Sequence, residues 1–226
     1  VGLVSSLEVA TVTVLLTIFL ELFSIDQIIG VWNQKDGKQL YLSAVWTNFF
    51  SHYVLGVFFY TVAICLFGRE DRPEGSWLAS VGSVTTIIVV HNVCYYYAHK
   101  TMHEPAFYKY HRYHHRFNTY VTPSSASAVS VVEYILAYVL PFIPCCMLAR
   151  PTELEMRIGT ELVSIASLLI HTPLFEKLSL KVMPKFLVST FDHQEHHRKV
   201  RTKYAAPIIS IDWILEQWGS SKMKKL

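Results

Sequence analysis

Five long apolar segments constrain the fold of this 226-residue chain more than any other feature. An α-helix needs about 20 consecutive apolar residues to cross the hydrocarbon core of a bilayer. Only 16% of the residues are charged, against ~25% in typical soluble domains. We therefore predict an all-α integral membrane protein, a helical bundle of about four to five membrane helices in a single domain over residues 1–226. The apolar segments cover residues 9–25, 44–67, 79–98, 125–148 and 156–175.

The five segments differ in how well they fit a membrane span. The second and third are the clearest, whereas Glu21 interrupts the first. Arg157 and Glu161 lie in the fifth, which is compatible with a segment only partly in lipid. Pro141 and Pro144 predict a kink or a break near the end of the fourth, because proline removes a helical hydrogen bond.

Eight of the 11 histidines are gathered in three short motifs. The first is an HxxxH motif, the second is HRYHH, and the third is HQEHH, which repeats the spacing of the second. Residues three or four apart share a face of a helix, so each motif should bring two or three imidazoles together. The segments at 125–148 and 156–175 form a hairpin, so all three motifs should lie at one membrane face. The motif histidines are His99, His103, His111, His114, His115, His193, His196 and His197.

A histidine-rich site of this kind indicates metal binding. One histidine at a membrane face is most simply a polar interfacial group, but eight neutral imidazoles packed without a cation would leave many ring nitrogens poorly satisfied. Zinc usually takes four ligands, so eight histidines suit two ions. Imidazole binds Zn, Cu, Fe and Ni alike. We hypothesise a redox metal that uses oxygen, because a membrane lipid offers unactivated C–H bonds that zinc chemistry does not attack.

The three motifs together resemble those of the sterol desaturase and fatty acid hydroxylase superfamily. The resemblance covers about residues 84–219, which would form a fatty acid hydroxylase-like core. It implies a di-iron centre that uses O2 and two electrons to hydroxylate or desaturate a membrane lipid, either a sterol or a fatty acyl chain. Zinc could substitute for iron. The electrons would come from an external donor, typically cytochrome b5.

The resemblance also assigns roles to residues outside the motifs. Tyr96 stands three residues before His99, where the family commonly has Tyr, and Glu133 matches the acid of the family's HPxE stretch. His171 matches a histidine found at the end of the last hairpin and is a ninth candidate ligand. Asn92 occupies the position of the family's usual Asp. Asn92, Tyr96 and Glu133 are thereby implied to support the ligands, as groups behind metal-binding histidines do.

Several supporting positions depart from the family pattern. Lys100 replaces an Arg and loses its planar donor fork. Ser130 and Val131 replace the His and Pro of HPxE, and KYA at 203–205 replaces NYG. Conserved ligands with altered supports are compatible with a divergent substrate or with a site that no longer turns over. Two alternatives therefore stay open: a non-catalytic or vestigial accessory subunit of a larger membrane protein assembly, and a zinc-dependent membrane hydrolase.

The basic residues predict how the chain is oriented. The histidine side collects 16 of the 20 Lys and Arg residues. An excess of Lys and Arg marks the cytoplasmic side, so the histidines should face the cytosol. The net charge of +3 suits contact with anionic lipid and requires no nucleic-acid partner. The resemblance implies a location in the endoplasmic reticulum, and the membrane of another organelle is the alternative. The C-terminal KMKKL fits a KxKxx retrieval signal or, equally well, a basic tail beside lipid.

Overall fold

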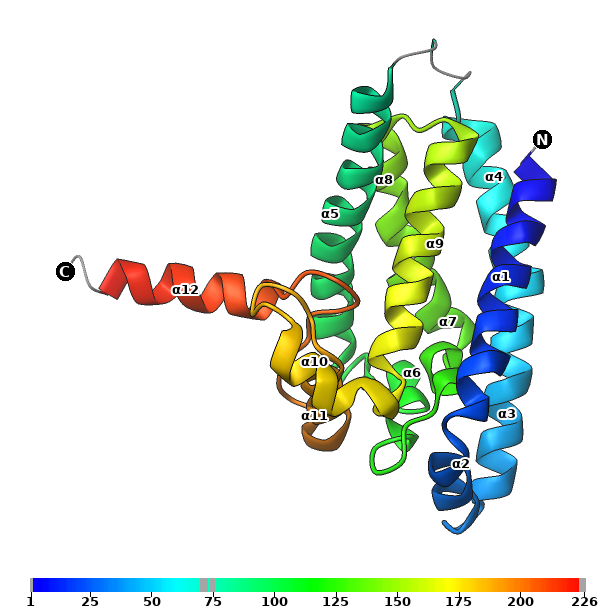
Figure 1. Cartoon of the computed structure of the whole chain (residues 1–226), viewed down its shortest axis with the longest axis vertical. Coiled ribbons are helices and arrows are strands. Elements are labelled where there is room, and N and C mark those ends of the chain that lie inside the picture. The colour runs from blue at the N-terminus through cyan, green and yellow to red at the C-terminus, as the bar shows by residue number, and fades with distance from the viewer. Residues whose placement is uncertain (1, 70–72, 74–75, 224–226) are drawn as a thin grey trace.

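The computed structural model describes residues 2–69, 73 and 76–223, with side chains through residue 220. It is a bundle of long helices with shorter helices gathered mainly at one end (Figure 1). No strand occurs among these described residues. The predicted all-α bundle is therefore confirmed. The C-terminal KMKKL pattern extends beyond the described residues.

Four helical runs are long and apolar enough to cross a membrane, or up to five if a bent pair is one span. The bent pair joins α9 (Glu153–Ile170) to η5 (Pro173–Phe175) and α10 (Glu176–Val182) at an angle of 76°. The predicted number of about four to five membrane helices agrees with this count. The four continuous runs are α1 (Gly2–Leu22); α3 (Gly37–Phe50) with η1 (Ser51–Gly56) and α4 (Val57–Phe67); α5 (Trp77–Met102); and α7 (Val131–Glu133) with η4 (Tyr134–Val139) and α8 (Leu140–Ala149).

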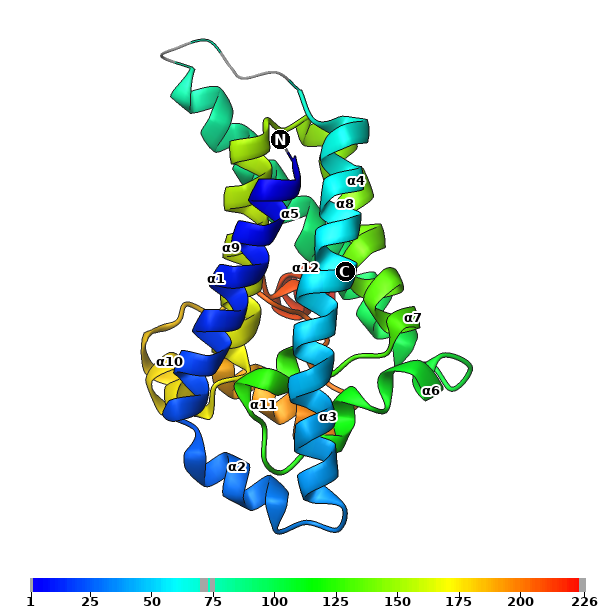
Figure 2. The same ribbon diagram turned by 90° about the vertical axis from the view of Figure 1, so that its right-hand side faces the viewer.

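Close packing between α5 and α9 forms the centre of the bundle. Gly159 of α9 lies against Ile87 of α5, and a Cβ at position 159 would be only 2.9 Å from Ile87 Cγ2. A capping box begins α9, with Thr152 Oγ1 accepting from the Glu155 N–H and Glu155 Oε2 accepting from the Thr152 N–H. On the other side, α1 packs against both α4 and α9 (Figure 2). These contacts fix the helices that end at the histidines.

The predicted disturbance near Pro141 and Pro144 takes a different form. Helix α8 continues through Pro144 to Ala149, and the departure from α-helical geometry falls before the prolines, in the π-helical segment η4. Pro141 has no N–H to offer the carbonyl of Ala137, which lies within η4. A wider turn ahead of the proline therefore replaces the expected break.

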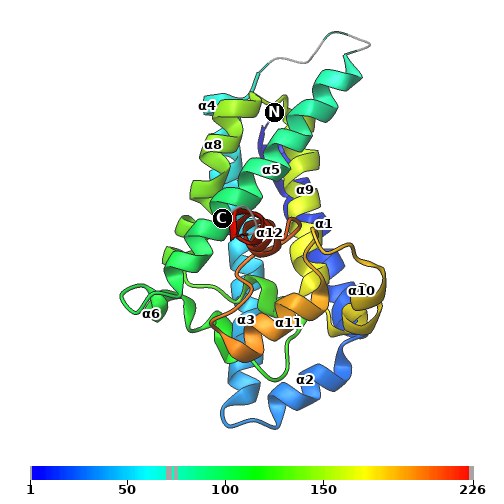
Figure 3. The same cartoon turned by 90° about the vertical axis from the view of Figure 1, so that its left-hand side faces the viewer.

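Short helices complete the chain around the lower end of the bundle in Figure 1. Helix α10 exposes Leu178, Leu180 and Val182, as an interfacial helix would. Helix α12 (Ile211–Met223) projects sideways from the bundle, and Figure 3 views it nearly end-on beside α5. The remaining short elements are α2 (Ile25–Trp32), α6 (Tyr108–His111), η2 (His114–Arg116), η3 (Pro123–Ser127), α11 (Thr190–Lys199) and α12 (Ile211–Met223).

Candidate metal centre

Five elements bring the predicted ligands to one end of the bundle, near the lower end of α5 (Figure 3). The first motif ends α5, the second spans α6 and η2, and the third lies within α11. His171 is the C-cap residue of α9 and lies in the same region as the three motifs. All of these histidines are buried except His103, which is half-buried.

The nine histidines form two separate groups. Within each group one ring nitrogen per residue lies within 4.8 Å of every other. Each of the two groups of imidazoles could hold a metal ion. The first group is His99, His103, His111, His115 and His196, and the second is His114, His171, His193 and His197.

The paired histidines of each HxxHH motif divide between the two groups. We expected His111 to share a site with both His114 and His115, but it shares one only with His115, and His114 joins the second group. In the second motif the helix ends at His111, so the motif is not a single helical face. In the third motif, adjacent residues of a helix point about 100° apart, which directs His196 and His197 to different groups.

Hydrogen bonds at Nδ1 determine the tautomer of five rings. The Nδ1 atoms of His99, His114, His171 and His196 lie 2.6–3.1 Å from backbone carbonyl oxygens, and that of His111 lies 2.6 Å from Glu133 Oε1. A carbonyl oxygen accepts, so each Nδ1 that faces a carbonyl must carry the proton, and an ionised Glu133 accepts from His111 Nδ1 in the same way. In the neutral ring Nε2 is then left with a lone pair. The carbonyls belong to Tyr204, Ser125, Ser167 and Thr202.

These Nε2 lone pairs point at one another. The Nε2 atoms of His99 and His111 are 3.0 Å apart, and those of His114 and His171 are 3.5 Å apart. Two lone pairs at such distances repel unless a cation lies between them. His196 Nε2 is also buried, with no hydrogen-bond partner in the described part of the chain. The donor set therefore fits metal ions held through Nε2, with Nδ1–H donated outward as ligating histidines usually do.

Burial keeps the imidazoles of the centre in the neutral form that metal ligation requires. Desolvation lowers the pKa of His196 to about 4. Desolvation, followed by the charge of His196, lowers the pKa of His103 to about 3. The same two causes lower the pKa of His115 to about 2. At neutral pH these rings are consequently lone-pair donors.

Glu133 supports the first group directly. Its carboxylate is buried, and it accepts from Nδ1 of His111. Ser130, which replaces the family's histidine, caps the short helix that carries Glu133: its Oγ accepts from the Glu133 N–H at 3.1 Å and donates to the Tyr110 carbonyl at 3.0 Å. The substitution at Ser130 thus serves to position the predicted acid.

Asn92 and Tyr96 support the ligands indirectly, through the chain segment that follows the third motif. Asn92 Oδ1 accepts from the N–H groups of Ile208 and Ile209 at 2.9 Å, which holds this segment against α5. Tyr96 packs with Met102, Ala205 and Ala206. Neither side chain bonds to a histidine ring among the described residues. Both instead secure the segment that begins at Tyr204, whose carbonyl accepts from His99.

The other two histidines lie outside both groups. His91 is buried on α5, with its ring 4.6 Å from that of Phe142. His52 lies in η1, and its Nε2 is 3.1 Å from Ser127 Oγ.

The four carbonyl acceptors of the site were not predicted, because every residue has a carbonyl and no sequence signal marks those that point at an imidazole.

Comparison with known protein families gives a match over more than half of the chain. The family model described as fatty acid hydroxylase matches residues 84–217, which include all nine histidines of the two groups and Glu133. No curated protein and no solved structure matches the chain significantly.

Proposed function

The chain belongs to the fatty acid hydroxylase family, within the sterol desaturase and fatty acid hydroxylase superfamily, and from this premise we propose that it is an O2-dependent lipid hydroxylase or desaturase with two iron ions. The two converging sets of Nε2 lone pairs are the observation that supports this proposal most strongly. Bound iron would supply the redox chemistry, with O2 as co-substrate and a separate donor of the cytochrome b5 type as the source of electrons.

The residues of this chain would hold and orient the metals. The first group offers five imidazoles to one ion and the second offers four to the other. The outward hydrogen bonds from Nδ1 keep five of the nine rings in the ligating tautomer and resist their rotation. In its ionised form Glu133 would add negative charge behind His111, which would make that imidazole a stronger donor.

Burial would protect the chemistry of the centre. Eight of the nine proposed ligands are buried, so bulk water is kept from the metals. The half-buried His103 lies on the more exposed side of the first group. Residues 84–219 would form the catalytic core of a single membrane domain, with the histidine end facing the cytosol, in the endoplasmic reticulum or another organelle membrane.

The preserved support of the ligands favours an enzyme over a vestigial accessory subunit. The contact from His111 to Glu133 persists although the neighbouring HPxE positions have changed, and Ser130 still orders the turn that carries the acid. A subunit retained only for its fold would not require this buried carboxylate, which is costly to place in an apolar environment.

The proposal can be tested with the iron-loaded protein in mild detergent. It would be supplied with a total membrane lipid extract, cytochrome b5, its reductase, NADH and isotopically labelled O2. We expect a hydroxylated lipid carrying the label or a lipid with a new double bond. His114→Ala and His196→Ala, one variant for each group, should abolish turnover. Near-normal product from either variant, or none from iron-loaded wild type, would contradict the proposal.

A further inference from the structure

Helix α1 carries a partly buried carboxylate that belongs to neither histidine group. Glu21 is the residue that interrupts the first apolar segment of the sequence, and it lies one residue before the end of α1. An ionisable side chain in a membrane helix is costly, and it marks a specific partner or a function. Figure 2 shows α2 joining the lower ends of α1 and α3, at the end of the bundle that carries α11. Glu21 therefore lies at the same end as the histidines.

Both oxygens of Glu21 are used to hold η3. Oε1 accepts from the Ser124 N–H at 2.8 Å and also from the Ser124 hydroxyl. Oε2 accepts from the Tyr41 hydroxyl of α3 at 3.1 Å. Ser124 is buried, so removal of the carboxylate would leave its N–H without this acceptor, at a cost in free energy. The carboxylate thus ties α1 and α3 to the start of η3.

The next residue of η3 is the acceptor for a proposed ligand. The Ser125 carbonyl accepts from Nδ1 of His114 at 3.1 Å. This bond sets the tautomer and the orientation of the ring, whose Nε2 lies 3.5 Å from Nε2 of His171. Glu21 and His114 consequently bind adjacent residues of one short helix. A shift of η3 at Ser124 would move the acceptor of His114 with it.

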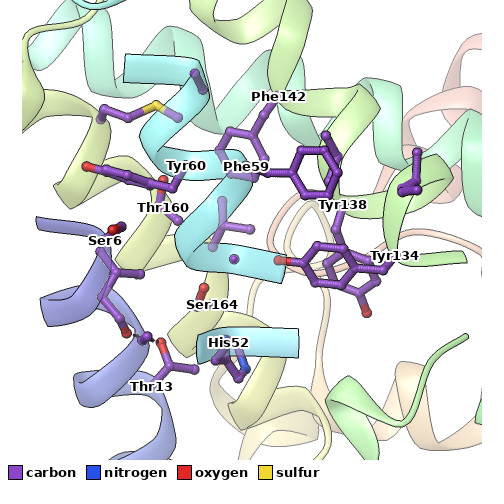
Figure 4. Close-up of a pocket in the computed structure, with 18 of the residues that line it drawn as sticks. Ser6, Thr13, His52, Phe59, Tyr60, Tyr134, Tyr138, Phe142, Thr160 and Ser164 are labelled. Carbon is purple, nitrogen blue, oxygen red and sulfur yellow. Dashed lines mark hydrogen bonds between the residues drawn. The ribbon is translucent and has the colours of Figure 1, made fainter. Parts of the chain in front are cut away.

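Other contacts hold the rest of η3 in place. Leu20 of α1 packs against Ala126, and Tyr138 Oη of η4 donates to the Ala126 carbonyl at 3.1 Å. At the end of η3, Ser127 Oγ lies 3.1 Å from Nε2 of His52. Figure 4 shows His52 and Tyr138 on the wall of the cavity between α1, α4, α8 and α9. The N-terminal helices therefore fix η3 at both ends, with the carboxylate at its start and an imidazole at its end.

The first histidine group takes its support from a different part of the chain. Its Nδ1 acceptors are Glu133 and the carbonyls of Thr202 and Tyr204. All three residues lie within the family match over residues 84–217. None of these three acceptors belongs to the N-terminal helices, so a change in α1 should reach the first group less directly than the second.

The second group depends more strongly on η3. The Nδ1 atoms of His193 and His197 are buried without a hydrogen-bond partner in the described part of the chain. Only His114 and His171 of this group have an Nδ1 acceptor among those residues, and that of His171 is a carbonyl of its own helix. The bond from His114 to η3 is therefore half of the outward support of the second group, and it depends on residues that precede the family match.

We propose that Glu21 is a positioning residue of the second metal group. It fixes η3, and thereby the Ser125 carbonyl, so that His114 presents its Nε2 to the ion. This inference rests on the metal binding in the proposed function, and it extends the site to a helix outside the family match. Glu21 acts through Ser124 and not on a ligand ring. Its loss should weaken the second ion and leave the first unchanged.

Metal binding resolved by site tests the proposal without turnover. His196→Ala should retain only the second ion and His114→Ala only the first, so each background isolates one group. Glu21→Ala would be combined with each, and the metal-free chain in mild detergent would be titrated with Co²⁺ against a chelator. The visible absorption of Co²⁺ also reports its coordination. We expect about 10–100-fold weaker binding of the second ion with an altered absorption band, and unchanged affinity for the first.

Glu21→Gln separates positioning from a general loss of stability. The glutamine keeps an acceptor oxygen for Ser124 but loses the charge, and hydrogen bonds to a charged acceptor are about twice as strong as neutral ones. Its affinity for the second ion should therefore lie between those of the wild type and Glu21→Ala. This variant also keeps the test valid if Glu21→Ala does not fold.

The matched control is Glu8→Gln, which alters another carboxylate of α1. Glu8 pairs with Arg157 of α9, nearer the other end of α1. Both ions should bind to this variant as they do to the wild type.

Three results would overturn the proposal while the proposed function stands. They are an unchanged second ion in folded Glu21→Ala, or in Glu21→Gln if the alanine variant does not fold; equal weakening of both ions; and an equal loss of the second ion in Glu8→Gln. A folded wild-type chain that binds no Co²⁺ would overturn this proposal together with the proposed function.

Discussion

At the scale of single residues, the site is defined by which ring nitrogen carries the proton. Nine imidazoles converge, and in five of them an oxygen acceptor at Nδ1 leaves Nε2 free to donate a lone pair to a metal. The HxxxH and HxxHH spacings predicted that the motif histidines would converge, but not how they divide between the two groups. They could not predict the carbonyls of Tyr204 and Thr202 as acceptors, because backbone groups carry no residue identity.

Removing the charge of Glu133 should weaken the first metal group selectively. Glu133→Gln keeps the side-chain size but replaces the charged acceptor of His111 Nδ1 by a neutral amide oxygen. Loss of such a supporting group typically costs about 10–100-fold in metal affinity. Metal competition by a chelator would measure the change. Glu161→Gln on α9, which lies outside both groups, is the control and should bind metal as the wild type does.

At the scale of elements, the geometry of a helix explains how the two adjacent histidines of the HQEHH motif serve different groups. Helix α11 presents His193 and His197 to one group and His196 to the other, so a single helix ties both groups together. The repeated HxxHH spacing predicted that the histidines converge. It did not predict their division between two groups, because the spacing within one motif does not determine the positions of the neighbouring helices. The π-helical turn in η4 was unpredicted for a similar reason: Pro141 signals a disturbance, but the surrounding packing decides its form.

The contact between α5 and α9 should control how well the two groups are assembled. Gly159→Leu would push α9 away from Ile87. The proposed ligand His171 caps α9, and His99 lies in the last turn of α5. We expect a lower thermal midpoint in detergent and a lower metal content. Gly82→Ala on α5 is the control, because a Cβ there meets no atom within 4 Å, and this change should be neutral or slightly stabilising. Equal behaviour of the two variants would argue against this role of the helix contact.

At the scale of the whole molecule, the apolar segments predicted the bundle and the motifs predicted which end of it carries the site. Composition and spacing suffice for this because membrane spans are limited in length and must satisfy their own backbone hydrogen bonds. The cavity between α1, α4, α8 and α9 could not be predicted, since its lining is drawn from four helices whose rotation no local pattern determines.

The buried imidazoles should make the metal-free protein sensitive to acid. The folded-state pKa is about 4 for His196 and about 3 for His103, whereas an unfolded histidine titrates near 6.5. Below about pH 6.5 the unfolded chain therefore binds more protons, and the free energy of unfolding falls progressively toward pH 4. The thermal midpoint of metal-free protein should be lower at about pH 5 than at about pH 7. An equal or higher midpoint in acid would show that these rings are solvated.

The most direct test of the account is the metal content of the purified chain in mild detergent. Two groups of histidines predict about two iron ions per chain, and His114→Ala and His196→Ala should each remove about one, because they belong to different groups. His91→Phe, which alters a histidine outside both groups, should retain both ions. A folded protein that contains no metal, or one that holds its full metal content after both substitutions together, would contradict the central claim that these lone pairs bind a pair of ions.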